Sequence, residues 1–252
     1  MSEEAIMLSI RHLSFAYQGH PVFDDISYDF SKGQVIGLMG ANGTGKTTLM
    51  RILTGLIPVE SGMVLFQGQP LSYKKKSLYQ LRQAVNMVFQ DPNQQLFYPT
   101  VEEDVAFALH NLKRDPVEIK DRVEAALKAL GIFDLAKRPI QTLSYGQKKR
   151  VALAGILVIQ PAMILLDEPT VGLDPAGVKD LSAIIKDLVK DGHRFLISSH
   201  DMAFLYQLCD QYLAIADKGI VAQGDSDQVF KSEAFMESIG LELPWQVRVQ
   251  KQ

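Results

Sequence analysis

The chain has 252 residues, of which 47% are hydrophobic and 22% are charged, a balance typical of a globular protein with one α/β domain. Its net charge of −3 argues against a nucleic-acid binder, because such proteins carry a basic face. The single cysteine, Cys209, excludes a disulfide framework and a thiolate metal site. No apolar run reaches the roughly 18 residues of a spanning helix, so we expect any membrane role to require a partner.

The first part of the chain predicts an antiparallel β region followed by a strand and a helix. Apolar residues alternate loosely over residues 6–30, as in short antiparallel strands joined by turns. Residues 34–39 form a short apolar run that ends in glycines, which indicates a buried parallel strand. Residues 46–54 have apolar side chains at helical spacing, and Gly55 is expected to end that helix.

The rest of the chain alternates between predicted strands and predicted helices. Asp115-Pro116 and Asp174-Pro175 each place an N-cap residue before a proline in a first helical turn. The apolar stripes that follow end at Gly131 and Gly192. Apolar runs predict core strands at residues 85–89, 162–166, 195–198 and 212–215.

This alternation predicts an α/β fold whose mostly parallel sheet has helices on both faces, after an N-terminal antiparallel β part. The segment of about 91–160 is mostly helical and interrupts the alternation, so we interpret it as an inserted α-helical sub-lobe. The remaining core would cover about 1–90 and 161–224, with a C-terminal extension over about 225–252 of a single domain, 1–252.

Residues 40–47 match the phosphate-loop pattern G-x-x-x-x-G-K-[ST] between a predicted strand and a predicted helix. Glycines let backbone N–H groups approach phosphates, and the helix adds its positive dipole end, so we expect a P-loop NTPase core. Lys46 is expected to reach the β- and γ-phosphates of ATP, and Thr47 to bind Mg²⁺. The predicted ATP contacts here are Gly40, Asn42, Gly43, Thr44, Gly45, Lys46, Thr47 and Thr48.

Two acidic residues, Asp167 and Glu168, follow the strand predicted at residues 162–166. Taken alone, such a pair is commonly only the end of a strand. Beside a phosphate loop, it predicts that Asp167 supports the Mg²⁺ shell and that Glu168 orients or deprotonates the attacking water.

Ser144 and Gln147 have the spacing of a capping box, which in its simplest interpretation only begins a helix. The same geometry favours a functional interpretation, because a capped helix N-terminus is also an anion site. Since the chain already has a phosphate loop, we expect this second anion site to bind the nucleotide of a partner subunit.

In this order the motifs resemble those of the nucleotide-binding subunits of ABC transporters, over nearly the whole chain. The positions that carry the resemblance are Tyr17, residues 40–48, Gln90, residues 143–147, Asp167-Glu168, Gly172-Leu173-Asp174 and His200.

The resemblance implies roles for residues that no single motif assigns. Tyr17 would stack on adenine, and Gln90 would contact Mg²⁺ and the attacking water and relay the state of a membrane partner. His200 would hold the γ-phosphate, and Asp174 would lie at a dimer interface.

The segment 143–147 differs from the family's usual Leu-Ser-Gly-Gly-Gln at one position, where Tyr145 replaces the first glycine. The resemblance implies that Ser144, Gly146 and Gln147 close over the γ-phosphate of the opposite subunit. A bulky residue at position 145 would either narrow the backbone conformations there or lie with its ring pointing outward.

Residues 90–97, 99–107 and 147–155 resemble more narrowly the energy-coupling-factor (ECF) ATPases, and among these the cobalt/nickel branch. This resemblance implies an importer of a micronutrient, either a cobalt or nickel ion or a vitamin. The implied partners are a second ABC ATPase subunit, an integral membrane coupling protein and a substrate-binding membrane subunit. Residues 90–105 would form the groove that receives the coupling helices, at the cytoplasmic face of the cell membrane.

Other functions remain open at this point. The chain resembles, less specifically, the ATPases of other ABC importers and exporters. Soluble ABC ATPases act in DNA repair, chromosome organisation or translation, but the long insertions or paired domains of those classes are absent here. The second subunit is either another copy or a related chain, and we expect the tail with Trp245 to contribute a dimer contact.

Overall fold

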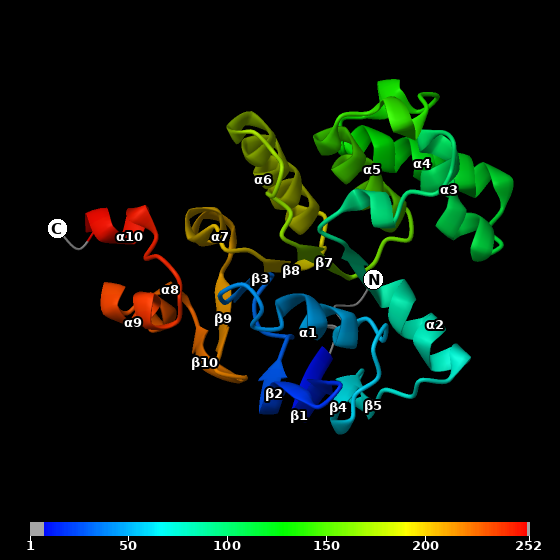
Figure 1. The fold of residues 1–252 in the computed structure, drawn as a ribbon. Helices are drawn as coiled ribbons and strands as arrows, with labels where there is room; N and C mark the ends of the chain where they lie inside the picture. Colours follow the sequence, from blue (N-terminus) through cyan, green and yellow to red (C-terminus); the bar gives the residue numbers. More distant parts are fainter. Residues whose placement is uncertain (1–7, 251–252) are drawn as a thin grey trace.

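The computed structural model describes residues 8–250, and within this range the strands form two sheets (Figure 1). One is a four-stranded antiparallel sheet in the order β2-β1-β4-β5, and the other is a six-stranded sheet in the order β10-β9-β3-β8-β7-β6. The α/β fold expected from the sequence is therefore confirmed. Residues 6 and 7 of the first predicted β segment, and both ends of the predicted domain, lie outside the described residues.

The antiparallel sheet consists of β1 (Leu8–Tyr17), β2 (His20–Asp29), β4 (Ser61–Phe66) and β5 (Gln69–Pro70). The first two strands are longer than the short strands that the sequence predicts. Their pairing shifts register between Ile10 and Leu13, and again after Leu13 and Phe15. Each shift breaks the inside–outside alternation of side chains, which explains why the pattern in residues 6–30 is loose. The sequence analysis did not predict β4 and β5.

The larger sheet places three strand ends side by side. Strand β3 pairs in parallel with β8, and β8 pairs in parallel with β7. Carboxyl ends of parallel strands meet at one edge, so the residues that follow these three strands lie near each other. The strands of this sheet are β3 (Val35–Met39), β6 (Val85–Val88), β7 (Met163–Asp167), β8 (Arg194–Ser198), β9 (Gln211–Ala216) and the antiparallel edge strand β10 (Gly219–Gly224).

The helices begin and end close to the positions that the sequence predicts wherever it makes a prediction. Asp115 caps α4 and Asp174 caps α6, each through its carboxylate, as expected. The described helices are α1 (Lys46–Leu53), α2 (Lys75–Ala84), α3 (Val101–Asn111), α4 (Pro116–Ala129), α5 (Tyr145–Leu157), α6 (Pro175–Lys190), α7 (Met202–Leu208), α8 (Ser226–Val229), α9 (Glu233–Ser238) and α10 (Trp245–Gln250). Within residues 8–250, no helix combines the length and the apolar character needed to span a membrane.

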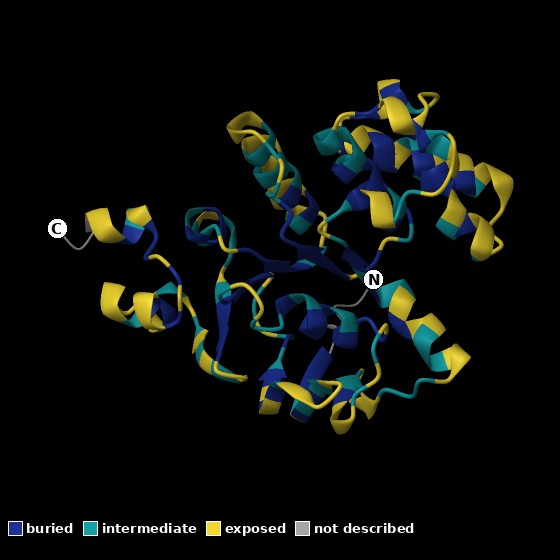
Figure 2. Cartoon of the chain, in the orientation of Figure 1, coloured by how far each residue is buried: buried dark blue, intermediate teal, exposed yellow. Residues whose placement is uncertain are grey.

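Helix α1 lies between the two sheets, and the central strands around it are the most buried part of the chain (Figures 1 and 2). Its core-facing side chains have no exposed surface; these are Leu49, Met50, Ile52 and Leu53. Helices α3, α4 and α5 pack in a second cluster that also includes Ile164 of β7 and Phe195 of β8. The helical segment thus shares one hydrophobic core with the large sheet.

Leu53→Ala should destabilise the protein by about 2–5 kcal/mol, because it opens a cavity between the sheets under the phosphate loop. Leu56→Ala is the matched control, since Leu56 is 47% exposed just beyond the same helix and should change the free energy of unfolding by less than about 0.5 kcal/mol. Urea unfolding measures both values. Equal losses would contradict the placement of α1 in the core.

Candidate nucleotide-binding site

The phosphate loop joins β3 to α1, and its backbone geometry requires glycine at position 45. Gly45 has φ of 102°, a left-handed conformation that side chains disfavour. A Cβ there would lie 2.6 Å from Cγ1 of Val22 and 2.7 Å from Cζ of Phe23. No side chain caps α1, so the first-turn N–H groups are available to an anion.

Lys46 is buried with its ammonium inside the phosphate loop. Its Nζ donates to the carbonyl oxygens of Gly40 at 2.7 Å and Ala41 at 3.2 Å. The same atom lies 3.7 Å from Oε1 of Glu168. The loop therefore holds a fixed positive charge beside a carboxylate, as phosphoryl chemistry requires.

Glu168 is a buried carboxylate with one oxygen free of hydrogen bonds. Its Oε1 has no hydrogen-bond partner, and its Oε2 lies 2.9 Å from Nδ1 of His200. Buried acceptors without partners are rare and costly, so this atom is suited to receive a proton or a water molecule. Of the residues that the sequence analysis expects to act in hydrolysis, Lys46 and His200 each lie beside a different oxygen of the Glu168 carboxylate.

Asp167 lies at the end of β7 and binds two hydroxyl groups. The hydroxyl of Thr47 donates to Oδ2 at 2.7 Å, and that of Ser198 donates to Oδ1 at 2.6 Å. These hard oxygen donors fit Mg²⁺, which prefers carboxylates, hydroxyls and water. Gln90 is exposed just after β6, the strand next to β7. Residues 8–250 contain no group of three His, Cys, Asp or Glu side chains that could hold a metal ion.

The remaining predicted ATP contacts lie around this centre. Tyr17 ends β1 with 44% of its surface exposed, and its ring meets Phe15 edge-on at 4.9 Å. The hydroxyl of Thr44 donates to the carbonyl of Ala41 at 3.0 Å, which closes the loop on itself. Thr48 is buried, whereas Asn42 and Gly43 are exposed.

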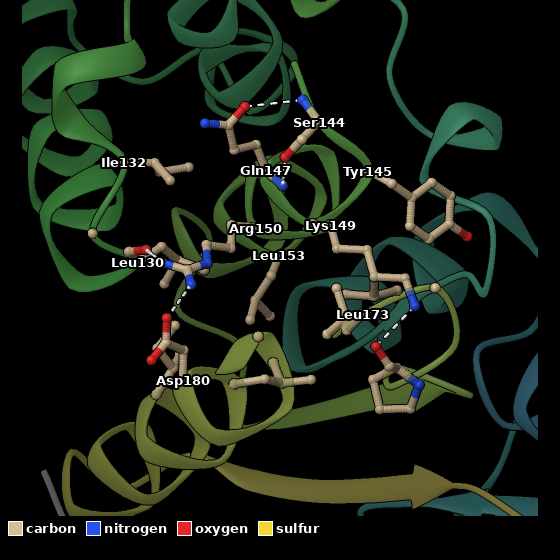
Figure 3. Close-up of a pocket in the computed structure, with 18 of the residues that line it drawn as sticks. Leu130, Ile132, Ser144, Tyr145, Gln147, Lys149, Arg150, Leu153, Leu173 and Asp180 are labelled. Carbon is tan, nitrogen blue, oxygen red and sulfur yellow. Dashed lines mark hydrogen bonds and ion pairs between the residues drawn. The ribbon is translucent and has the colours of Figure 1, made fainter. Parts of the chain in front are cut away.

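The predicted signature residues Ser144, Gly146 and Gln147 lie at the start of α5. Ser144 and Gln147 form the expected capping box, with Ser144 Oγ accepting from the Gln147 N–H at 3.3 Å. Both line a cavity of about 600 Å³ together with Gly146 and Asp174, and none of the described lining residues belongs to the phosphate loop (Figure 3). Asp174 is exposed and caps α6 by accepting from the Gly177 N–H at 2.7 Å.

Two residues support the site although the sequence analysis assigned them no role. Ser198 accepts a hydrogen bond from the Glu168 N–H at 3.0 Å, in addition to its bond with Asp167. Lys149 is buried, and its Nζ donates to the carbonyl oxygens of residues 168, 169 and 171 at 3.3, 2.8 and 2.7 Å. Burial lowers the pKa of Lys149 to about 8, against the opposing effect of Glu168. A buried lysine has no local sequence signal, since its partners lie far along the chain.

A second cavity, of about 430 Å³, lies between the phosphate loop and the C-terminal extension. Asn42 and His200 line it on one side, and Trp245 and Arg248 on the other. Trp245 is 60% exposed, so the tail borders the nucleotide site with a large aromatic ring.

Comparisons with known proteins agree with this geometry. A sequence model of the ABC transporter family matches residues 23–171. The chain is 46% identical to the cobalt import ATP-binding protein CbiO of Salmonella typhimurium, over 98% of this chain and 91% of that protein. It is 41% identical to the energy-coupling factor transporter ATP-binding protein EcfA of Methanocaldococcus jannaschii, over 94% of this chain and 86% of that protein.

Among solved structures, cbiO1 from Clostridium perfringens, described as part of the ABC transporter complex cbiONQ, superimposes with a TM-score of 0.84. Its sequence is 35% identical, and the match covers 99% of this chain and 100% of that one. The chain therefore belongs to the ABC transporter family, as one of its ATP-binding subunits. Subunits of this class are ATPases.

Lys46→Ala should lower the rate of ATP hydrolysis at least about 100-fold, since it removes the buried charge that faces the phosphates. Lys186→Ala makes the same change on the exposed face of α6 and should leave the rate within about twofold. Phosphate release measures both. Retained hydrolysis in Lys46→Ala would place the nucleotide elsewhere.

Proposed function

We propose that this chain hydrolyses MgATP to energise an ECF-type importer of a micronutrient. The observation that carries the proposal is the buried Glu168 carboxylate, with its free Oε1 at 3.7 Å from the Lys46 ammonium. Glu168 acts on the attacking water, Lys46 binds the β- and γ-phosphates, and His200 holds the γ-phosphate. The full-length similarity to CbiO and EcfA supports the importer type.

The proposed cofactors are ATP and Mg²⁺. Thr47, Asp167 and Gln90 would hold the metal, partly through water, and when bound it would supply positive charge beside the phosphates. The exposed ring of Tyr17 stacks on adenine. The backbone of residues 40–48 surrounds the phosphates.

We propose that two subunits, either two copies or this chain and a related ATPase, enclose two MgATP molecules head to tail. None of residues 40–48 lines the cavity that Ser144 borders, which supports this arrangement. Ser144, Gly146 and Gln147 then close over the γ-phosphate of the opposite subunit, and the exposed Asp174 lies at the interface. ATP joins the subunits until hydrolysis removes the γ-phosphate. Trp245 remains a predicted dimer contact.

Glu168→Gln should trap an ATP-bound dimer, because the amide keeps the shape of the side chain but accepts no proton from the water. With MgATP and micromolar protein, the variant should elute at twice the monomer mass in size-exclusion chromatography with light scattering. The same variant combined with Lys46→Ala is the control and should not respond to MgATP. A Glu168→Gln protein that stays monomeric with MgATP would contradict the proposed head-to-tail dimer.

Residues 90–105 are the proposed docking surface for a membrane partner. Phe97 and Tyr98 in this surface are 74% and 40% exposed, and the ring of Tyr98 lies 5.2 Å from that of Phe107, which lies just beyond it and is 41% exposed. The buried Asp104 holds the loop in place, since Oδ1 accepts from the N–H groups of Phe97 and Tyr98 at 2.7 and 2.9 Å. Exposed aromatic rings on an ordered loop favour a protein interface.

The proposed partners are an integral membrane coupling protein and a substrate-binding membrane subunit. The chain itself would then lie on the cytoplasmic face of the cell membrane as a peripheral subunit. The proposed cargo class is a cobalt or nickel ion or a vitamin, and the Salmonella typhimurium relative, whose name assigns it to cobalt import, favours the metal ion. The net charge of −3 gives no support to a nucleic-acid partner.

Purification of the tagged chain from detergent-solubilised native membranes tests the proposal. We expect mass spectrometry to find a transmembrane coupling protein and a small hydrophobic subunit. Phe97→Glu should lose both, because a charge then faces the apolar interface. Val117→Glu is the matched control, since Val117 is 69% exposed on α4 and should keep both. Recovery of ribosomes, DNA or soluble proteins alone would contradict the proposed importer function and leave only the ATPase activity.

A further inference from the structure

Tyr145 departs from the usual signature pattern. The sequence analysis left open whether its ring points outward, and the structure answers this question. The ring does not point outward. The phenol oxygen donates a hydrogen bond of 3.1 Å to the backbone carbonyl of Gln90. The ring also lies against Gly172, because a Cβ built on that glycine would be 2.7 Å from Cε1 of Tyr145. One side chain therefore contacts both the segment after β6 and the segment after β7.

Lys149 extends this contact to the residues that carry the catalytic carboxylate. It follows Tyr145 by one turn of α5, and its Nζ lies 5.3 Å from the centre of the tyrosine ring. The same Nζ donates to the carbonyl of Glu168 and to two carbonyls just beyond it. Figure 3 shows both side chains leaving α5 on the same side. The two residues thus connect Gln90 to the backbone of Glu168.

The phenol of Tyr145 acts in this contact as a hydrogen-bond donor. Burial raises the pKa of Tyr145, and the nearby carboxylate of Asp91 raises it further. The hydroxyl therefore keeps its proton at neutral pH and can donate to a carbonyl oxygen, which only accepts.

We propose that Tyr145 is a positioning residue for ATP hydrolysis, which holds the Gln90 backbone in a fixed place relative to the segment that carries Glu168. The inference rests on the roles proposed above for Gln90 and Glu168. Since Gln90 begins the proposed docking surface, a displacement of that surface by a membrane partner reaches the catalytic carboxylate of the same chain. A glycine at position 145 has no side chain to make either contact.

Tyr145→Phe is the smallest change that tests this role, because it removes the hydroxyl and keeps the ring on Gly172. We expect kcat for ATP hydrolysis to fall about three- to tenfold, the rate equivalent of one lost hydrogen bond. We expect KM for ATP to stay within about twofold, since the phosphate loop is unchanged. Tyr73→Phe is the matched control, because the hydroxyl of Tyr73 also bonds to the backbone, where it accepts from the N–H of Val59 away from the site. The kcat of the Tyr73→Phe variant should equal that of the parent.

A double-mutant cycle with Gln90→Ala separates positioning from general stability. The alanine keeps the backbone carbonyl but has no side chain for Tyr145 to position. The combined variant should therefore be no slower than Gln90→Ala alone. If Tyr145 had a purely structural role, the fold-decrease in kcat of the double variant would instead equal the product of the two single-variant decreases.

Three results would overturn the inference, and the third is distinguishable from the first two. If Gln90→Ala lowers kcat but Tyr145→Phe matches the parent, or if their effects multiply, Tyr145 has no positioning role although the proposed function stands. If Gln90→Ala itself hydrolyses ATP at the parent rate, the proposed role of Gln90 fails, and the inference fails with it.

Discussion

The rest of the site depends on two opposite charges, Lys46 and Glu168, buried 3.7 Å apart at the edge of the large sheet. Burying such a pair costs free energy unless the surrounding groups fix it. Glu168 also has φ of 45°, a conformation that residues with side chains seldom adopt. The hydroxyl and carbonyl of Ser198 bind its N–H, and the ammonium of Lys149 binds its carbonyl. The backbone of Glu168 is therefore held at both its N–H and its carbonyl, which makes its unusual φ compatible with a stable fold.

The shared hydrophobic core explains how distant parts of the chain serve one site. Helix α5 packs in the same cluster as β7 and β8, although the helical segment is inserted between β6 and β7. The close packing of protein interiors transmits displacement rather than absorbing it. The signature residues at the start of α5 and the acidic residues at the end of β7 are thus parts of one packed unit, and the contacts of Tyr145 and Lys149 add polar links to it.

The sequence predicted those features whose signals are local. The phosphate loop, the acidic end of β7 and the capping box of Ser144 each occupy a few consecutive residues, and the structure agrees with all three. Helix α2 was missed because only one of its residues, Leu81, is buried, so it has no apolar stripe. Lys149 and the orientation of Tyr145 were not predictable, because their partners are about 20 to 55 residues away and become neighbours only in the fold. The domain boundaries and the roles of the site residues remain predictions.

The position of Trp245 gives the protein a built-in optical probe. It is the single tryptophan of the sequence, and it borders the cavity that Asn42 of the phosphate loop and His200 also line. Indole emission shifts in wavelength with the polarity of its surroundings. Any event that fills or dries this cavity therefore changes the intrinsic fluorescence of the whole chain, without an added dye and without background from a second indole.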